Sequence, residues 1–188
     1  MAVYSYRETV YTLAQDGPTL TAAGTNTILS NTTPRYTFPA GYFYRIGQSL
    51  KVVATGRISS VITTPGTARF DIRLSNTVIF DGLAVVLDPT IAYANVGWIL
   101  EVEMTTRSVG QNGMTWWSQG KWTCNDIVGV PAGTPRGALT AILPWNSTPL
   151  VSPSIVNSES ALILDCLFTQ TVATGSLTCH QFKVIAEN

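Results

Sequence analysis

The segment ARFDIRLS, residues 68–75, alternates apolar and polar side chains at every position. Successive side chains of a β-strand point to opposite faces of a sheet. The pattern therefore predicts a strand on which Phe70, Ile72 and Leu74 face a core, while the charged residues between them face outward.

The same two-residue period recurs on both sides of this segment. It appears in the ranges 49–59, 98–109, 161–171 and 176–186. Within 98–109, Leu100, Val102 and Met104 share one face. Turn signals such as Asp81-Gly82 separate the runs, and no helical period of any length is present. We therefore expect an all-β protein, an antiparallel jelly-roll-like β-sandwich, with residues 1–15 as a short N-terminal arm and 16–188 as a single jelly-roll-like domain.

Charge is scarce in this chain. Charged residues make up 12% of the sequence, and the lysines are only Lys51, Lys121 and Lys183, whereas threonine occurs 26 times. Threonine favours strands. Because sheet edges are commonly protected by lysine and other charges, we expect partner subunits to cover some edges and faces here. This favours a cyclic homo-oligomer.

Several classes of function are disfavoured by composition. The net charge is zero and no basic run is present, which argues against a nucleic-acid partner. No apolar run is long enough to span a membrane, and the N-terminal residues do not resemble a secretory signal. The three cysteines are widely spaced and are expected to be buried thiols rather than disulfides or metal ligands. We expect no cofactor and no metal.

Residues that could support catalysis are few. Glu101 and Glu103 lie two positions apart on a predicted strand, so they share a face, but a solvated or interface-facing surface explains them better than a glycosidase pair. His180 is the only histidine. Cys179, beside it, should point to the opposite face, so the two cannot bind one metal ion without a β-bulge. We therefore expect no enzyme activity and name no catalytic residue.

Aromatic residues provide the candidate interface. Trp116 and Trp117 are consecutive on a predicted strand, so one should face the core and the other should face away. Outward tryptophans are common at interfaces between proteins. Tyr4, Tyr6 and Tyr11 lie in the weakly charged N-terminal stretch, which could either pack on the core or dock on a neighbour. These five residues are the interface candidates.

The order of several segments resembles a family of small virion proteins of tailed bacteriophages, of the head decoration or cement type. The segments are DGPTLT (16–21), TNTILS (25–30), RYTFPAGYF (35–43), IGQSLKVVATGRIS (46–59), TTPGTARFDIRL (63–74), WILEVEMTTRSVG (98–110), GKWT (120–123) and SLTCHQF (176–182). They span most of the chain and are structural rather than catalytic motifs.

The resemblance implies a jelly-roll-like domain on the exterior of a phage capsid, assembled in the host cytoplasm. It implies a homotrimer that binds the assembled lattice of the major capsid protein and stabilises the head. A second hypothesis is a tail, baseplate or fibre protein with a receptor- or sugar-binding role, since exposed tryptophans can stack on sugars. A free carbohydrate-binding module or an enzyme is the third.

Overall fold

A computed structural model describes residues 7–29, 35–111, 113–125, 139–145, 150–151 and 156–187. Every regular element in these ranges is a β-strand. The strands are β1 (Arg7–Thr12), β2 (Gly24–Thr27), β3 (Thr37–Phe38), β4 (Ser49–Ser60), β5 (Thr67–Leu74), β6 (Thr77–Asp81), β7 (Val85–Val86), β8 (Tyr93–Ser108), β9 (Thr115–Cys124), β10 (Leu139–Leu143), β11 (Leu150–Val151), β12 (Leu162–Gln170) and β13 (Ser176–Glu187).

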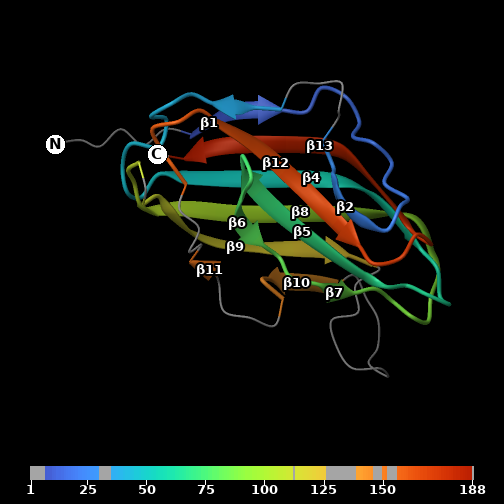
Figure 1. The fold of residues 1–188 in the computed structure, drawn as a ribbon. Coiled ribbons are helices and arrows are strands. Elements are labelled where there is room, and N and C mark those ends of the chain that lie inside the picture. The colour runs from blue at the N-terminus through green and yellow to red at the C-terminus, as the bar shows by residue number, and fades with distance from the viewer. Residues whose placement is uncertain are drawn as a thin grey trace.

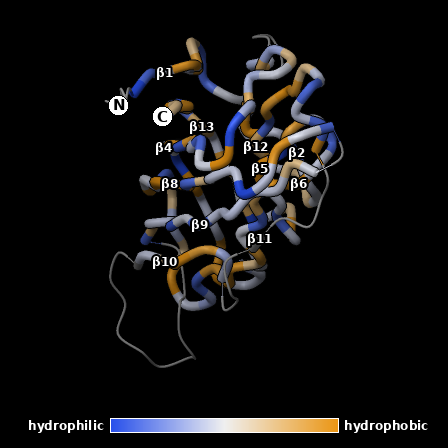
Figure 2. The backbone as a smooth tube through the Cα atoms, turned by 90° about the vertical axis from the view of Figure 1, so that its left-hand side faces the viewer, coloured by the Kyte–Doolittle hydropathy of each residue, from blue (hydrophilic) through white to orange (hydrophobic). Residues whose placement is uncertain are grey.

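The strands form two antiparallel sheets that pack face to face (Figures 1 and 2). The large sheet has the order β1-β13-β4-β8-β9-β10, and β11 also pairs with β9. The small sheet has the order β2-β12-β5-β6, with β3 paired to β12 and β7 paired to β5. The predicted all-β sandwich is therefore confirmed.

The strand order explains the jelly-roll character of the sandwich. Along the chain, β1, β4, β8 and β13 belong to the large sheet, while β2, β5, β6 and β12 belong to the small sheet. The chain thus crosses repeatedly between the sheets, as in two joined Greek keys. Strands β9 and β10 extend the large sheet beyond this eight-stranded core, so part of the large sheet continues past the edge of the small one.

Large aromatic side chains fill the space between the sheets. Phe70 from the small sheet lies between the buried rings of Trp98, Trp122 and Phe168, with ring centroids 5.1–5.3 Å apart. Such offset and edge-on pairs contribute beyond the area that they bury. Most of the tryptophans thus serve the core.

The predicted alternation is confirmed on the main strands. In β4 the even-numbered residues from Leu50 to Ser60 are buried and the odd-numbered ones are not. In β5, Phe70, Ile72 and Leu74 are buried, as expected. Asp71, expected to face outward into solvent, is also buried; its carboxylate lies 2.9 Å from the guanidinium of Arg73. An ion pair with a neighbour on the same strand face therefore replaces solvation.

The N-terminal residues differ in part from the expected arm. Residues 7–12 form β1, which pairs with the outer edge of β13. That edge would otherwise leave backbone N–H and C=O groups unpaired, and Arg7 adds an ion pair to Glu187 at 3.1 Å. The chain therefore enters the sheet at Arg7, nine residues before the expected domain boundary at residue 16.

Candidate binding face

The outer face of the large sheet carries a shallow groove. It has a volume of about 350 Å³ and crosses β4, β8, β9 and β10. We call it the Trp117 groove, and it is lined by Lys51, Glu101, Glu103, Trp117, Gln119, Gly120, Lys121 and Ile142. Apart from Gly120, which contributes backbone, the lining residues of β4, β8 and β9 are all odd-numbered. Ile142 of β10 lies opposite Lys121 of β9. Their side chains point away from the core because of strand alternation.

Two ion pairs cross the groove between neighbouring strands. Lys121 Nζ lies 2.8 Å from Glu101 Oε2, and Lys51 Nζ lies 3.3 Å from Glu103 Oε1. Each pair joins residues that the sheet register places directly opposite one another. The hydrogen bond from Lys121 holds the pKa of Glu101 below its ordinary value. Glu101 is thus a stable carboxylate at neutral pH and is poorly suited to act as a general acid.

The groove also presents apolar surface. Trp117 is half-buried, and the Arg107 guanidinium carbon lies 5.8 Å from its ring centroid. Ile142, from β10, is 56% exposed. The adjacent Trp116 points the other way and is fully buried, with its ring 4.9 Å from that of Phe43. The prediction that one of these two tryptophans faces the core and the other faces away is therefore confirmed, and Trp117 is the one that reaches the surface.

Of the tyrosine candidates, Tyr11 does not join this face. Tyr11 packs against the core, with ring centroids 5.9 Å from Tyr36 and 6.2 Å from Phe182, and burial raises its pKa. Of the two hypotheses for the N-terminal stretch, core packing therefore holds for Tyr11. Tyr4 and Tyr6 lie outside the described residues.

A second hollow lies on the same face toward the other end of the strands. His180, at a bulge in β13, lies on its border, and its Nδ1 is 3.0 Å from Asp16 Oδ2. Cys179 is buried while His180 is exposed, so the two do point to opposite sides despite the bulge. His180 thus has a surface partner and no access to the thiol.

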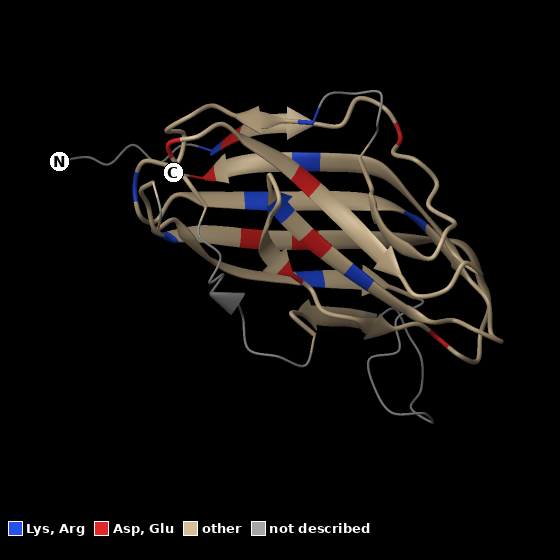
Figure 3. Ribbon diagram, viewed as in Figure 1, with Lys and Arg blue, Asp and Glu red and all other residues tan. Residues whose placement is uncertain are grey.

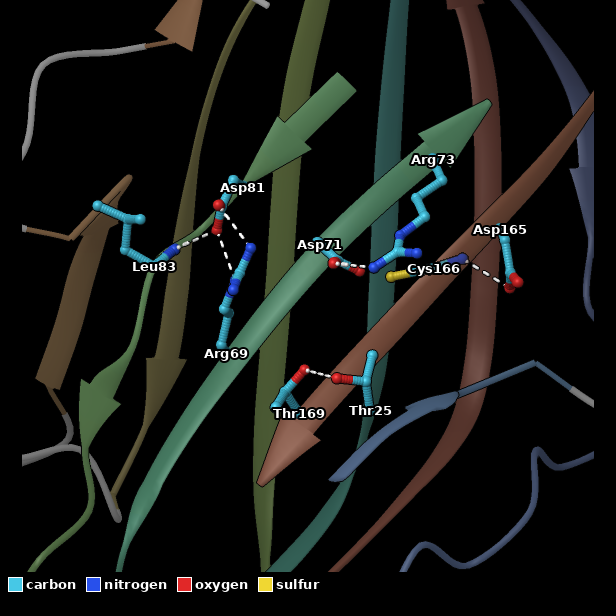
Figure 4. Close-up of polar contacts among 9 residues, drawn as sticks. All are labelled: Thr25, Arg69, Asp71, Arg73, Asp81, Leu83, Asp165, Cys166 and Thr169. Atoms are coloured by element: carbon cyan, nitrogen blue, oxygen red, sulfur yellow. Dashed lines mark hydrogen bonds and ion pairs between the residues drawn. The ribbon is translucent and has the colours of Figure 1, made fainter. Parts of the chain in front are cut away.

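The outer face of the small sheet carries a different polar arrangement (Figure 4). Arg69 and Asp81 join β5 to β6, and Arg73 neutralises Asp71. Asp165 of β12 accepts a hydrogen bond from Thr27 at 2.6 Å and also pairs with Arg35 at 2.8 Å. Charged groups on this face are therefore held by partners within the chain, which stabilises the sheet.

Figure 3 shows how the charged residues are spread over both sheets rather than gathered into one patch of a single sign. In the described ranges, no group of three or more His, Cys, Asp or Glu side chains is arranged to hold a metal ion. That part of the chain also contains no helix long and apolar enough to cross a membrane.

Sequence reasoning missed one prominent surface feature. Tyr44 and Ile46 have the highest exposed fractions among the exposed large apolar side chains of the described residues, at 70% and 66%. They lie in a loop before β4, where no strand period marks which side chains face solvent. The contribution of Gln119 and Lys121 to the groove also depends on strand register, which the sequence did not provide.

Comparison with known proteins does not identify a family for this chain. No protein-family model matches the chain, and no curated protein matches it. Among solved structures, the chain is similar to the CBM2 module of the evolved Dit of Lactobacillus casei BL23 phage J-1. The match has a TM-score of 0.40 and 10% sequence identity, and it covers 97% of each chain. A likeness of this strength carries no argument about function.

Proposed function

We propose that this chain is a structural subunit of a tailed-phage virion and that it acts by binding protein neighbours rather than by catalysis. The sequence resemblance described above supports the virion assignment and, within it, decoration of the capsid. The observation that carries the binding role is the outer face of the large sheet. Apolar surface is offered there by Trp117, Ile142 and the 45% exposed Ile99. The charged residues around them are already joined in two ion pairs.

Such a face is suited to protein contact. Aromatic and aliphatic groups provide the buried centre of an interface, and paired charges at its rim provide orientation without leaving an unpaired charge in the contact. A subunit that binds only the assembled lattice stabilises that lattice by mass action. Several linked copies add avidity.

The experiment is co-sedimentation with heads assembled from the major capsid protein of the same phage. The purified chain should pellet with assembled heads and stay in solution with unassembled capsid protein. Trp117→Ala should reduce pelleting, whereas Ile163→Ser, which changes an exposed residue of the small sheet, should leave it unchanged. Failure of the wild-type chain to pellet with heads would rule out capsid decoration.

One observation favours a second candidate, sugar binding by a tail or baseplate component. In the groove the partly exposed Trp117 lies among polar side chains that include Gln119 and Lys121. An aromatic face with neighbouring hydrogen-bonding groups is an arrangement that suits stacking on a sugar ring. A glycan array, followed by titration of Trp fluorescence, would test this candidate. Binding that Trp117→Ala abolishes would favour the tail hypothesis over capsid decoration.

A further inference from the structure

We propose that a loop before β4 inserts into the Trp117 groove of a second copy of this chain, so that repeated contacts close a cyclic oligomer. The loop comprises residues 42–48, and we call it the Tyr44 loop. The inference rests on the proposal that the chain works as an assembly subunit, and it identifies the surfaces through which the copies meet.

The Tyr44 loop holds its apolar tip rigidly. Gln48 is 4% exposed, and its Oε1 accepts hydrogen bonds from the backbone N–H groups of Tyr44 and Arg45 at 2.8 and 3.0 Å. Its Nε2 donates to the carbonyl of Tyr42 at 3.1 Å. A buried amide thus fixes the backbone beneath side chains that are themselves in solvent. A preorganised tip loses little conformational entropy when it binds.

The loop is also anchored to β8. Thr106 Oγ1 donates to the carbonyl of Arg45 at 3.0 Å, and the N–H of Gly47 donates to the carbonyl of Thr106 at 3.0 Å. Gly47 has a φ of 91°, a conformation that glycine adopts without strain. The loop therefore projects from the end of the sandwich that also carries the C-terminal end of β13 (Figure 1).

The chemistry of the tip complements that of the groove. Tyr44 and Ile46 are largely exposed apolar groups, and the groove offers Trp117 and Ile142 as apolar contacts. Between the two apolar residues of the loop lies Arg45, which stacks near Tyr44 at 5.8 Å and pairs with no carboxylate of the described residues.

The groove provides a carboxylate for this arginine. The side chain of Glu103 is 66% exposed, whereas that of its partner Lys51 is only 21% exposed. The Glu103 carboxylate is therefore the more accessible member of its ion pair and can accept a second contact from the guanidinium of Arg45. Tyrosine, tryptophan and arginine are the residue types that most often dominate binding energy at protein interfaces.

The loop and the groove are different surfaces, one at an end of the sandwich and the other on a face. Contact between a loop on one copy and a groove on another can be reciprocal in a two-fold dimer, or it can run head-to-tail and close into a ring when the rotation between copies is a simple fraction of a turn. A trimer is the form that we expect, in keeping with the sequence resemblance.

The test is the native mass of the purified full chain and its variants, measured by light scattering coupled to size exclusion. Wild type should elute as a trimer. Tyr44→Ser combined with Ile46→Ser should give a monomer, and Ile163→Ser, the matched control for loss of an exposed isoleucine, should remain a trimer. Near-UV circular dichroism checks that each variant retains the native fold. A monomeric wild type, or a loop variant with unchanged mass, would overturn the proposal.

A charge exchange tests the pairing itself. Arg45→Glu and Glu103→Lys should each shift the protein toward monomer at a given concentration, because each places like charges at the contact. The double variant restores opposite charges and should recover the trimer. If it dissociates as much as the single variants do, Arg45 does not meet Glu103. A wild-type chain that is monomeric but still pellets with heads would overturn this inference and leave the proposed function standing, since the two are measured separately.

Discussion

Arg69 of β5 and Asp81 of β6 form a two-pronged ion pair, with Arg69 Nε 2.7 Å from Oδ1 and Nη2 2.6 Å from Oδ2 of the aspartate (Figure 4). Asp81 Oδ1 also accepts a hydrogen bond from the backbone N–H of Leu83 at 2.9 Å. Leu83 has a φ of 57°, which is uncommon for a residue with a side chain. One carboxylate thus joins two strands and supports the turn that follows them.

Replacing this aspartate should destabilise the fold. Asp81→Ala removes three charge-assisted hydrogen bonds, and because the pair is partly exposed we expect the free energy of unfolding to fall by about 1–2 kcal/mol. The matched control is Glu187→Ala, which breaks the exposed single-contact ion pair with Arg7 and should cost at most about 0.5 kcal/mol. Urea denaturation measures both. Equal losses for the two variants would show that the two-pronged pair does not have this role.

Gly56 should be nearly irreplaceable. A Cβ added there would lie 1.9 Å from the carbonyl oxygen of Thr178 and 2.9 Å from the ring of Trp98. Because the first contact is with backbone, β4 and β13 would have to separate next to the bulge in β13. We expect Gly56→Ala to lower the free energy of unfolding by about 3 kcal/mol or more.

Gly97 is the matched control for that substitution. A Cβ at Gly97 has only the Arg57 side chain within reach, at 3.8 Å. Gly97→Ala should therefore change stability by about 0.5 kcal/mol or less. Thermal unfolding of both variants separates the effect of close strand approach from the general effect of replacing a strand glycine. A well-folded Gly56→Ala protein would contradict the packing described between β4 and β13.

Asp71 should make stability depend on pH in the opposite direction from most carboxylates. Burial raises its pKa, and Arg73 offsets this only in part. Between the ordinary pKa and the raised one, the folded state binds a proton that the unfolded state does not, so lowering the pH stabilises the fold through this group. Asp71→Asn removes the titration. The stability of wild type relative to this variant should rise as the pH falls from about 7 to about 4, and a flat or falling difference would contradict the assignment.

The thiols should be inert while the protein is folded. All three cysteines are buried, and burial raises the pKa of Cys179 to about 12 and that of Cys166 well above its ordinary value. Thiolate is the reactive form, so a thiol reagent at about pH 8 should label the native protein slowly and label all three residues after denaturation in guanidinium. Rapid labelling of native protein would mean that these strands open far more readily than their burial indicates.

The sequence predicted the parts of the fold that follow from local alternation. Phe70, Ile72 and Leu74 face the core as expected, because a period of two is sufficient to define the faces of a strand. The sequence left open whether the N-terminal stretch packs on the core or forms an arm, because its pairing with β13 joins residues almost a whole chain length apart. Local pattern contains no information about such a partner.

The candidate site was predictable only in fragments. Glu101 and Glu103 were expected to share a face, and they do, but their pairing with Lys121 and Lys51 depends on cross-strand register. Trp116 and Trp117 were expected to diverge, yet which of them was outward depends on the register of β9. The exposure of Tyr44 and Ile46 depends on the buried amide of Gln48, a tertiary feature that no sequence period reveals.

The central structural claim is that copies of the chain assemble with one another through the Tyr44 loop and the Trp117 groove, and the native mass of the wild-type protein across a range of concentrations tests it most directly. The chain has a mass of 20.2 kDa. The account predicts a species of three times that mass that persists on dilution, because each copy in a closed ring is held by two contacts. A monomer at every concentration would contradict it, since the apolar surfaces at Tyr44, Ile46 and Ile142 would then remain uncovered in the free protein.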